Sequence, residues 1–301
     1  MKKRNSSGSA LLLVLWAIIV VSIAVTGLVT VIQSDQDESG AIQHAFLARQ
    51  IAESQVALAS HPYIFPDDPS LAENTTLGGR CVTAVHEEGA RLDINHVLEK
   101  KRPEILSQLF ANWGLDPGQV SDLVESLRRW TQPEGLEPMS HDETAYYEEK
   151  FGASNAVPHR PFQTVEEMSM VRGMDALIAK KPDWQDYFTV WTDSGINLNS
   201  APPDLIAAVL GDQRAQISAL IQQRESMRTS PDEDDRVWTD IKIPLQILGV
   251  AADSRAASFF TVQNSVWRIE AVATVGTRNC LVGAVVSKDS VPSKTLYHYE
   301  R

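Results

Sequence analysis

Hydrophobic residues dominate the beginning of the chain. Residues 9–32 carry no charged side chain, and Lys2, Lys3 and Arg4 precede them. As a helix, this stretch would be about 36 Å long, enough to cross the roughly 30 Å hydrocarbon core of a bilayer. Basic flanks stay in the cytoplasm, so we expect everything after the span to be exported. No convincing small-residue cleavage site follows the span, which argues against a cleaved secretory signal and leaves a membrane anchor.

The hydrophobic pattern continues at helical spacing over residues 33–60. Leu47, Ile51 and Leu58 share one stripe, and four alanines and Val56 share the neighbouring stripe. Such a stripe needs a partner surface to cover it. We therefore predict one long helix, with 9–32 in the membrane and 33–60 packed on an exported domain until Pro62 ends it.

Beyond residue 60, strand-like and helical patterns alternate in blocks. Alternating apolar residues over 80–94 predict a hairpin around a turn at 87–89. Helical spacing returns at 105–113, 120–130, 164–174, 203–210, 214–226 and 243–248, and strand-like runs at 187–199, 259–262, 267–275 and 280–287. We predict an α+β fold, in which a long N-terminal helix packs on a small antiparallel sheet and a helical domain is inserted.

The predicted boundaries follow from these blocks. Two stretches, 87–95 and 193–199, look alike, since each has an acidic residue and a glycine before a short strand that ends in Asn. They predict matching strand-to-helix junctions.

We divide the chain into 1–8 as leader, 9–32 and 33–60 as helix, 61–95 as the first part of the head, 96–186 as the inserted helical domain, 187–288 as the rest of the head, and 289–301 as a polar tail.

Charge and motifs exclude several functions. The net charge of −12 makes the exported part acidic, which disfavours binding to phosphate backbones. The seven histidines form no metal-binding pattern, and neither a nucleophile elbow nor a phosphate-binding loop occurs. We expect no enzyme. Cys81 and Cys280 are the only cysteines, and in an exported compartment they form either one disulfide or two buried thiols.

The leader adds a specific signal. A short basic segment ends at Gly8, and the apolar helix begins at Ser9. This arrangement resembles the leader of type IV pilins and type II secretion pseudopilins, which prepilin peptidase cleaves after the glycine before methylating the new N-terminus. The resemblance implies cleavage between Gly8 and Ser9. Most such proteins have Glu at the fifth mature position, where this chain has Leu13; lacking it is typical of the K-type minor pseudopilin.

Two further motifs resemble the same K-type family. The first spans 161–174 and contains Gly173; the second spans 196–203 and contains Asn197, Asn199, Ser200 and Pro202. The resemblance implies a single-pass protein of the bacterial inner membrane with a periplasmic C-terminal domain. It implies a tip complex with I- and J-type minor pseudopilins that initiates and caps the pseudopilus, and contact with prepilin peptidase and the inner-membrane platform. Export of folded proteins is the implied role.

The resemblance also raises calcium as a cofactor, because some family members bind it in the helical domain. Calcium takes six to eight oxygen ligands, and Glu134, Glu137, Asp142 and Glu143 could supply some of them. However, this chain has 129–132 as Arg-Trp-Thr-Gln where the family often has Asp-Trp-Ile-Asp. A solvated acidic loop is the alternative interpretation.

Two rival functions remain at this stage. A minor pilin of a type IV pilus shares the leader and helix but usually retains the Glu. The segment after Asn199 also resembles a helix-hairpin-helix module, so a membrane-anchored DNA-uptake protein is the second rival. Its candidate turn, 210–213, has one glycine and an aspartate where phosphate would approach. We assign Asn197, Asn199 and Ser200 instead to tying the strand end and capping the next helix.

Overall fold

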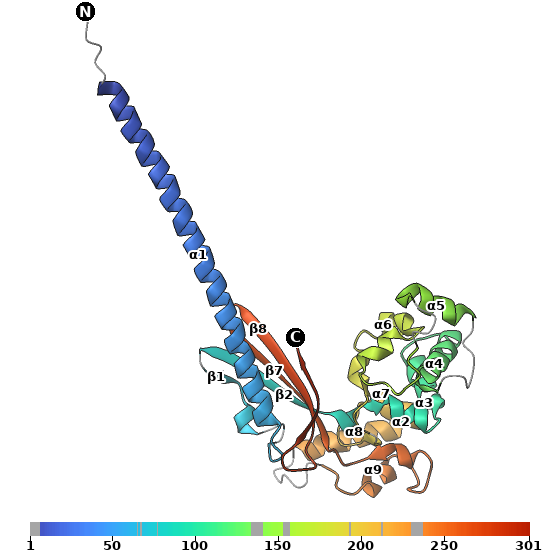
Figure 1. The fold of residues 1–301 in the computed structure, drawn as a ribbon. Coiled ribbons are helices and arrows are strands. Elements are labelled where there is room, and N and C mark those ends of the chain that lie inside the picture. Colours follow the sequence, from blue (N-terminus) through green and yellow to red (C-terminus); the bar gives the residue numbers. More distant parts are fainter. Residues whose placement is uncertain are drawn as a thin grey trace, which may run out of the picture.

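A single long helix begins the molecule. The computed structural model describes residues 7–64, 66, 68–76, 78–133, 141–152, 157–192, 194–211, 213–229 and 237–301. Helix α1 (Ser7–Ala59) has 53 residues, about 80 Å at 1.5 Å per residue. Its side chains from Leu11 to Ile32 are exposed, and the helix projects away from the rest of the chain (Figure 1). By length and composition it can cross a membrane.

The second half of α1 packs on an antiparallel sheet. The strand order is β1-β2-β7-β8-β9, with β1 at Asn74–Thr76, β2 at Gly79–Glu87, β7 at Val266–Val275, β8 at Arg278–Ser287 and β9 at Lys294–Glu300. Ala48, Ala52 and Ala59 of α1 are fully buried, in one hydrophobic cluster with Ala271 and Ala273 of β7. Small side chains on both surfaces let the helix lie close to the sheet. This confirms the predicted α+β class and the helix-on-sheet layout.

The sheet differs from the prediction in two places. The expected hairpin over 80–94 does not form, because β2 pairs along its whole length with β7, more than 170 residues later in the chain. The expected polar tail, 289–301, contains β9, which pairs with β8 and forms one edge of the sheet. Between α1 and β2, the described residues form the short helix η1 (Pro69–Leu71) and strand β1.

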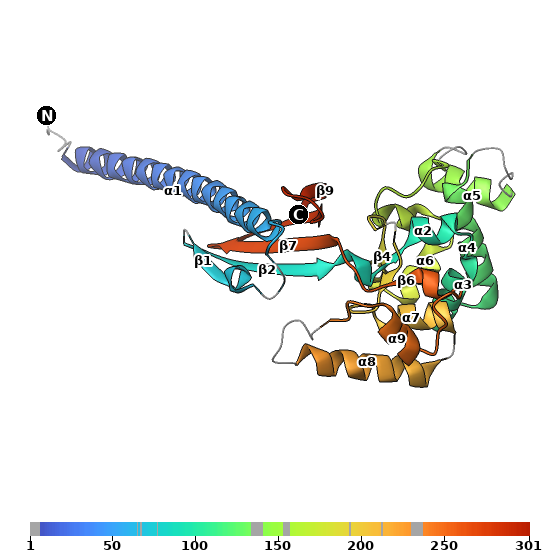
Figure 2. The ribbon, with the colours of Figure 1, turned by 90° about the horizontal axis from the view of Figure 1, so that it is seen from below.

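A helical domain is inserted between the ends of β2 and β7, beyond the end of the sheet that points away from the free half of α1 (Figure 2). Its elements are η2 (Glu88–Ala90), β3 (Leu92–Asp93), α2 (Ile94–Glu99), α3 (Pro103–Asn112), α4 (Pro117–Thr131), α5 (His141–Phe151), η3 (Glu166–Met170), α6 (Met174–Lys180), η4 (Trp184–Tyr187), β4 (Phe188–Thr189), β5 (Ile196–Asn197), α7 (Pro203–Leu210), α8 (Arg214–Arg228), α9 (Lys242–Ile247), η6 (Ala257–Phe259) and β6 (Phe260–Thr261).

One hydrophobic cluster unites this domain, and it runs from Leu92 to Phe260. The sheet and α1 have a separate cluster. The predicted boundary at residue 187 therefore differs from the structure, since β4 to β6 pack with the helical domain and the sheet resumes only at Val266. The periodicity of 187–262 indicated elements but could not show which core those elements join.

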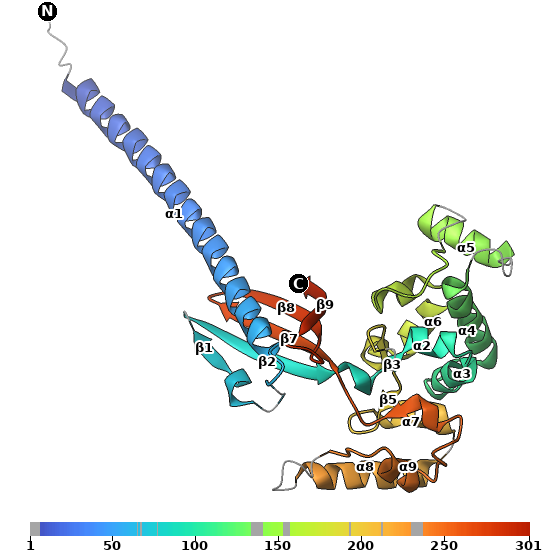
Figure 3. The ribbon, with the colours of Figure 1, turned by 60° about the horizontal axis from the view of Figure 1, so that its bottom comes forward.

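Two short parallel strand pairs repeat inside the helical domain. β3 pairs with β4 through Leu92 and Phe188, and β5 pairs with β6 through Ile196 and Phe260. Each first strand leads toward a helical segment, α2 after β3 and α7 after β5 (Figure 3). The structure thus has the matching strand-to-helix junctions that the similarity of 87–95 and 193–199 predicts.

Candidate functional site

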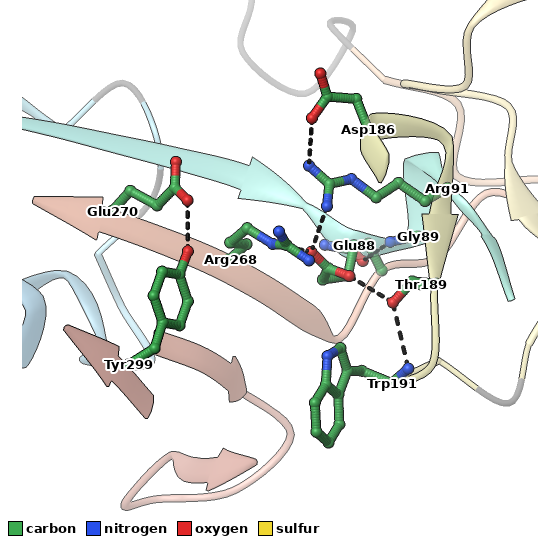
Figure 4. Close-up of polar contacts among 10 residues, drawn as sticks. Glu88, Gly89, Arg91, Asp186, Thr189, Trp191, Arg268, Glu270 and Tyr299 are labelled. Carbon is green, nitrogen blue, oxygen red and sulfur yellow. Dashed lines mark hydrogen bonds and ion pairs between the residues drawn. The ribbon is translucent and has the colours of Figure 1, made fainter. Parts of the chain in front are cut away.

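The helical domain joins the sheet through a buried carboxylate. Glu88 directly follows β2 and is 0% exposed. Its Oε1 accepts a hydrogen bond from Arg268 Nε of β7 at 2.6 Å, and Arg91 Nη1 lies 3.3 Å from the same oxygen. Its Oε2 accepts a hydrogen bond from the hydroxyl of Thr189 in β4. Figure 4 shows this arrangement, in which one side chain is bonded from both parts of the molecule.

Two guanidinium groups share this one buried carboxylate. Burial lowers the pKa of Arg91, and the charge of Glu88 only partly offsets that effect. Burial also lowers the pKa of Arg268, but the charge and hydrogen bond of Glu88 outweigh it, so the net pKa is raised. Asp186, 4.0 Å from Arg91 Nη2, supplies a second negative charge at the solvent edge. The cluster is therefore held together by charge pairing in a place where water has been excluded.

Aromatic side chains form a second contact between the two parts. Trp191 of the helical domain stacks on Tyr297 of β9, with ring centroids 5.4 Å apart and planes 23° apart. Tyr297 in turn stacks on Tyr299, whose hydroxyl donates to Glu270 of β7. Burial and this hydrogen bond raise the pKa of Tyr299. A cavity of about 140 Å³ lies between these rings and Arg268.

The motif at 196–203 contributes to the same junction. Asn197 Nδ2 donates to Glu87 Oε2 at 2.8 Å, and the Ser200 hydroxyl donates to the same oxygen. Asn199 is buried; its amide donates to the carbonyl oxygens of Trp238 and Val262, both at 3.0 Å. The motif thus connects the end of β2 to the second half of the helical domain.

The expected helix cap is not formed by these residues. Helix α7 begins at Pro203 with Pro202 at its N-cap position, and no side chain caps it. Proline at the start of a helix needs no N–H partner, which removes part of the need for a cap. In the other motif, Gly173 has φ +92° and precedes α6, and a Cβ there would contact Leu123 at 3.4 Å. A left-handed backbone against a neighbouring helix is the physical reason for this glycine.

Comparison with known proteins agrees with this architecture. Residues 90–182 match the family model described as type II secretion system protein K. Over this segment, the chain is similar to protein K. The structure is also similar to a chain in the crystal structure of the GspK-GspI-GspJ complex from the enterotoxigenic Escherichia coli type 2 secretion system. The alignment covers 89% of this chain and 98% of that chain, with a TM-score of 0.64 and 17% sequence identity. No curated protein matches the chain at a significant level.

The protein K segment includes the region in which calcium was expected. Glu134 and Glu137 lie outside the described residues. Asp142 is exposed at the start of α5, whereas Glu143 is 1% exposed and forms an ion pair with Arg129 of α4. Arg129 Nη1 donates to Glu143 Oε2, so this carboxylate is paired within the chain. No cluster of three metal-ligating side chains occurs among the residues that the structure describes.

The two cysteines do not form the disulfide that the sequence left open. Cys81 in β2 and Cys280 in β8 are both buried and free. Each is the register partner of Ala273 in the intervening strand β7. Two strand spacings put their Cα atoms about 9.5 Å apart, beyond the roughly 7 Å limit for a disulfide. Burial raises the pKa of both thiols.

The leader positions lie at the start of α1. Gly8 and Ser9 fall in its first turn, and Leu13 is 71% exposed on the apolar half. The sequence predicted the apolar helix, but it did not reveal the contacts of Glu88 with Arg91, Thr189 and Arg268, which we call the Glu88 cluster. Its sequence context, two glutamates and a glycine after a strand, is typical of a turn, and its partner Arg268 is 180 residues away. A carboxylate three residues before Arg91 was the only local signal.

Proposed function

We propose that this chain is a K-type minor pseudopilin of a type II secretion system. The observation that carries the proposal is the combination in one chain of three features: an exposed apolar helix, a sheet that covers only the second half of that helix, and a protein K segment inserted between β2 and β7. The first two features supply a subunit that can join a helical filament through α1. The third distinguishes it from an ordinary filament subunit.

In this proposal, the inner membrane holds the first half of α1 and the sheet and helical domain lie in the periplasm. Lys2, Lys3 and Arg4 keep the N-terminus cytoplasmic. The GspK-GspI-GspJ complex supports I- and J-type subunits as partners. Together they would form the tip of the pseudopilus, with burial of α1 faces stabilising the assembly and the exported proteins moving ahead of it. The inner-membrane platform would supply the growing filament beneath them.

The helical domain gives this subunit a capping role. It extends beyond the end of the sheet that points away from the free half of α1 (Figure 1). A further subunit adding above would have to occupy the same space, so the domain blocks growth in that direction. Leu13 is consistent with a terminal position, since it cannot provide the carboxylate that pairs with a neighbouring N-terminus.

The first test is processing by a prepilin peptidase. The full chain is expressed with and without the peptidase, and its intact mass and N-terminal sequence are measured. We expect cleavage between Gly8 and Ser9 and a methylated Ser9. Gly8→Val should block cleavage, whereas Gly27→Ala is the matched control, since a Cβ at Gly27 has no neighbour within 4 Å. Persistence of Met1 in the unmodified chain would contradict the proposal.

A second test isolates the capping role. Glu87 and Trp267 are register partners at the end of β2 and β7, so a two-residue Asn-Gly turn can replace 88–266 and close a hairpin. The sheet retains its separate core in this variant. Pseudopilus length is measured in cells by electron microscopy. We expect longer or more frequent filaments than with the full chain; equal lengths despite normal incorporation would refute capping while leaving membership of the tip complex intact.

The Leu13 position and the protein K match both favour secretion over a type IV pilus. The helix pair α7 and α8 is the helix-hairpin-helix-like segment, and Asn197, Asn199 and Ser200 at its start are bonded within the chain. We therefore propose no nucleic-acid partner.

A further inference from the structure

A basic pocket lies on the helical domain, beside a different face of α2 from the apolar groove that Leu98, Pro103 and Pro161 line. Its volume is about 440 Å³, and α2, the start of α3 and η6 surround it. The residues that line it are His96, Lys100, Arg102, Ser194, Gly195, Arg255, Ser258 and Phe259. None of these described lining residues is acidic, although the whole chain has a net charge of −12.

The backbone at the end of α2 directs the cations into the pocket. Lys101 has φ +51°, a left-handed conformation, and its N–H donates to the Leu98 carbonyl oxygen at 3.2 Å. The next N–H, that of Arg102, donates to the Val97 carbonyl oxygen at 3.1 Å. These two bonds are the Schellman motif that ends a helix. As a result Lys100 and Arg102 line the basic pocket, while Lys101 lines the neighbouring apolar groove.

Arg102 is the fixed centre of the pocket. It is 8% exposed, and its guanidinium carbon lies 4.8 Å from the centroid of the Phe259 ring. The His96 ring meets the same phenyl ring edge-on, with centroids 5.6 Å apart. Arg102 Nη1 also donates to the Arg255 carbonyl oxygen at 3.5 Å. A planar cation packed on an aromatic ring loses little freedom when it binds a ligand.

The acidic residues near the pocket do not occupy all the cationic side chains that line it. Glu104 accepts a hydrogen bond from Arg102 Nε, but it is more than half exposed and does not line the pocket. Asp93 is buried behind His96, where it accepts N–H bonds from His96 and Thr192. A guanidinium has five N–H donors, so Arg102 can bind Glu104 and a further anion together. Lys100 and Arg255 form no salt bridge within the described part of the chain.

We propose that this pocket binds an acidic peptide segment of a protein partner, with its carboxylates on Lys100, Arg102 and Arg255. A long polyanion would meet the acidic remainder of the molecule and be repelled, whereas a short segment is governed by charges within the Debye length of about 8 Å. The domain lies at the far end of the sheet from the free half of α1 (Figure 1), which disfavours a lipid headgroup. The proposal does not depend on the role in secretion.

The test measures binding of defined probes to the purified full-length chain in detergent. The probes are a blocked Asp-Glu-Asp-Glu peptide, its uncharged Asn-Gln-Asn-Gln counterpart, inorganic phosphate, and glycerol 1-phosphate as a lipid headgroup. The double variant Lys100→Asn, Arg255→Gln removes two exposed pocket cations without touching the core. Lys101→Asn is the matched control, because it removes one charge from the adjacent residue, which faces another groove, and Asn tolerates the left-handed conformation.

We expect the acidic peptide to bind and the uncharged peptide not to bind. The double variant should weaken binding at least about tenfold, Lys101→Asn should change it less than about twofold, and added salt should weaken it. Protection from hydrogen exchange should appear at 96–102 and 255–259. Equal binding by the double variant would overturn the proposal. So would tighter binding of phosphate or glycerol 1-phosphate than of the peptide, since the pocket would then be a site for a free anion or a headgroup.

Discussion

The Glu88 cluster provides the sharpest test of how the helical domain is held on the sheet. Replacing Glu88 by Ala removes the buried carboxylate that Arg268 and Arg91 share. Both domains keep their own hydrophobic clusters. The change should therefore act on the junction and not on either core.

The magnitude follows from burial. Removing one partner of a buried ion pair typically costs about 3–5 kcal/mol. The side chains of Arg268 and Arg91 are still 20% and 12% exposed, so water can rehydrate them in part, and we expect a loss of about 3 kcal/mol. Glu88→Gln keeps the size of the side chain and can still accept from Thr189, so its cost should be smaller, about 2 kcal/mol. Replacing both Glu88 and Arg268 by Met should cost less than Glu88→Ala.

The assay has two readouts on the full chain in detergent. Denaturant unfolding gives the free energy, and electron–electron distances between spin labels at the exposed Thr277 and Glu149 report the orientation of the domain. Glu88→Ala should broaden the distance distribution. Glu166→Gln is the control, since its pair with Arg301 also joins the two parts but both side chains are 48–66% exposed, and its cost should be below about 1 kcal/mol. Unchanged stability and an unchanged distance in Glu88→Ala would refute the argument.

The remaining predictions concern backbone strain, thiols and pH. Gly173→Ala should destabilise the chain by about 1–2 kcal/mol in denaturant unfolding, because alanine disfavours φ +92°. Lys101→Gly should instead stabilise the chain by up to about 1 kcal/mol, because glycine adopts the left-handed conformation freely. Cys81 and Cys280 should both alkylate after unfolding without reductant; a mass change of 2 Da on reduction, as a disulfide would give, would contradict the register. Burial raises the pKa of Asp93 above 3.8, so the native state binds that proton more tightly than the unfolded state, and stability falls as pH rises from 3.8 through the raised pKa. The stability of Asp93→Asn relative to the unmodified chain should therefore rise with pH over that window. A difference in stability that stays constant with pH would exclude this cause.

Elements with a strong local signal were predictable from the sequence. The uncharged run and the alanine-rich stripe of α1 gave the long helix, and alternation gave β7 and β8 nearly to the residue. Helices α3, α4, α7 and α8 also appear where their spacing predicts them. In each case the periodicity of one short stretch contains the required information.

Long-range pairing was not predictable in the same way. Strand β2 has the alternation of a hairpin strand, but its partner is β7, and the helical domain lies between them in the sequence. β9 has few buried side chains because it is an edge strand, and this made it look like a polar tail. The Glu88 cluster depends on that same pairing, since Arg268 reaches Glu88 only when β2 and β7 align. The apolar helix and the resemblance to protein K were readable without that pairing.

The place of the insertion explains why a buried charge cluster is useful here. The end of β2 lies beside the start of β7, so a domain can be inserted between them without disturbing the pairing of the sheet or the packing of α1. Two short connections alone would let the domain swing as on a hinge. Apolar contacts are non-directional and would tolerate several orientations, whereas the Glu88 carboxylate requires Arg268, Arg91 and Thr189 at once. We infer that the cluster contributes a single orientation more than it contributes stability. The proposed capping role would require that single orientation, because a swinging domain would leave the growth end of a filament open for part of the time.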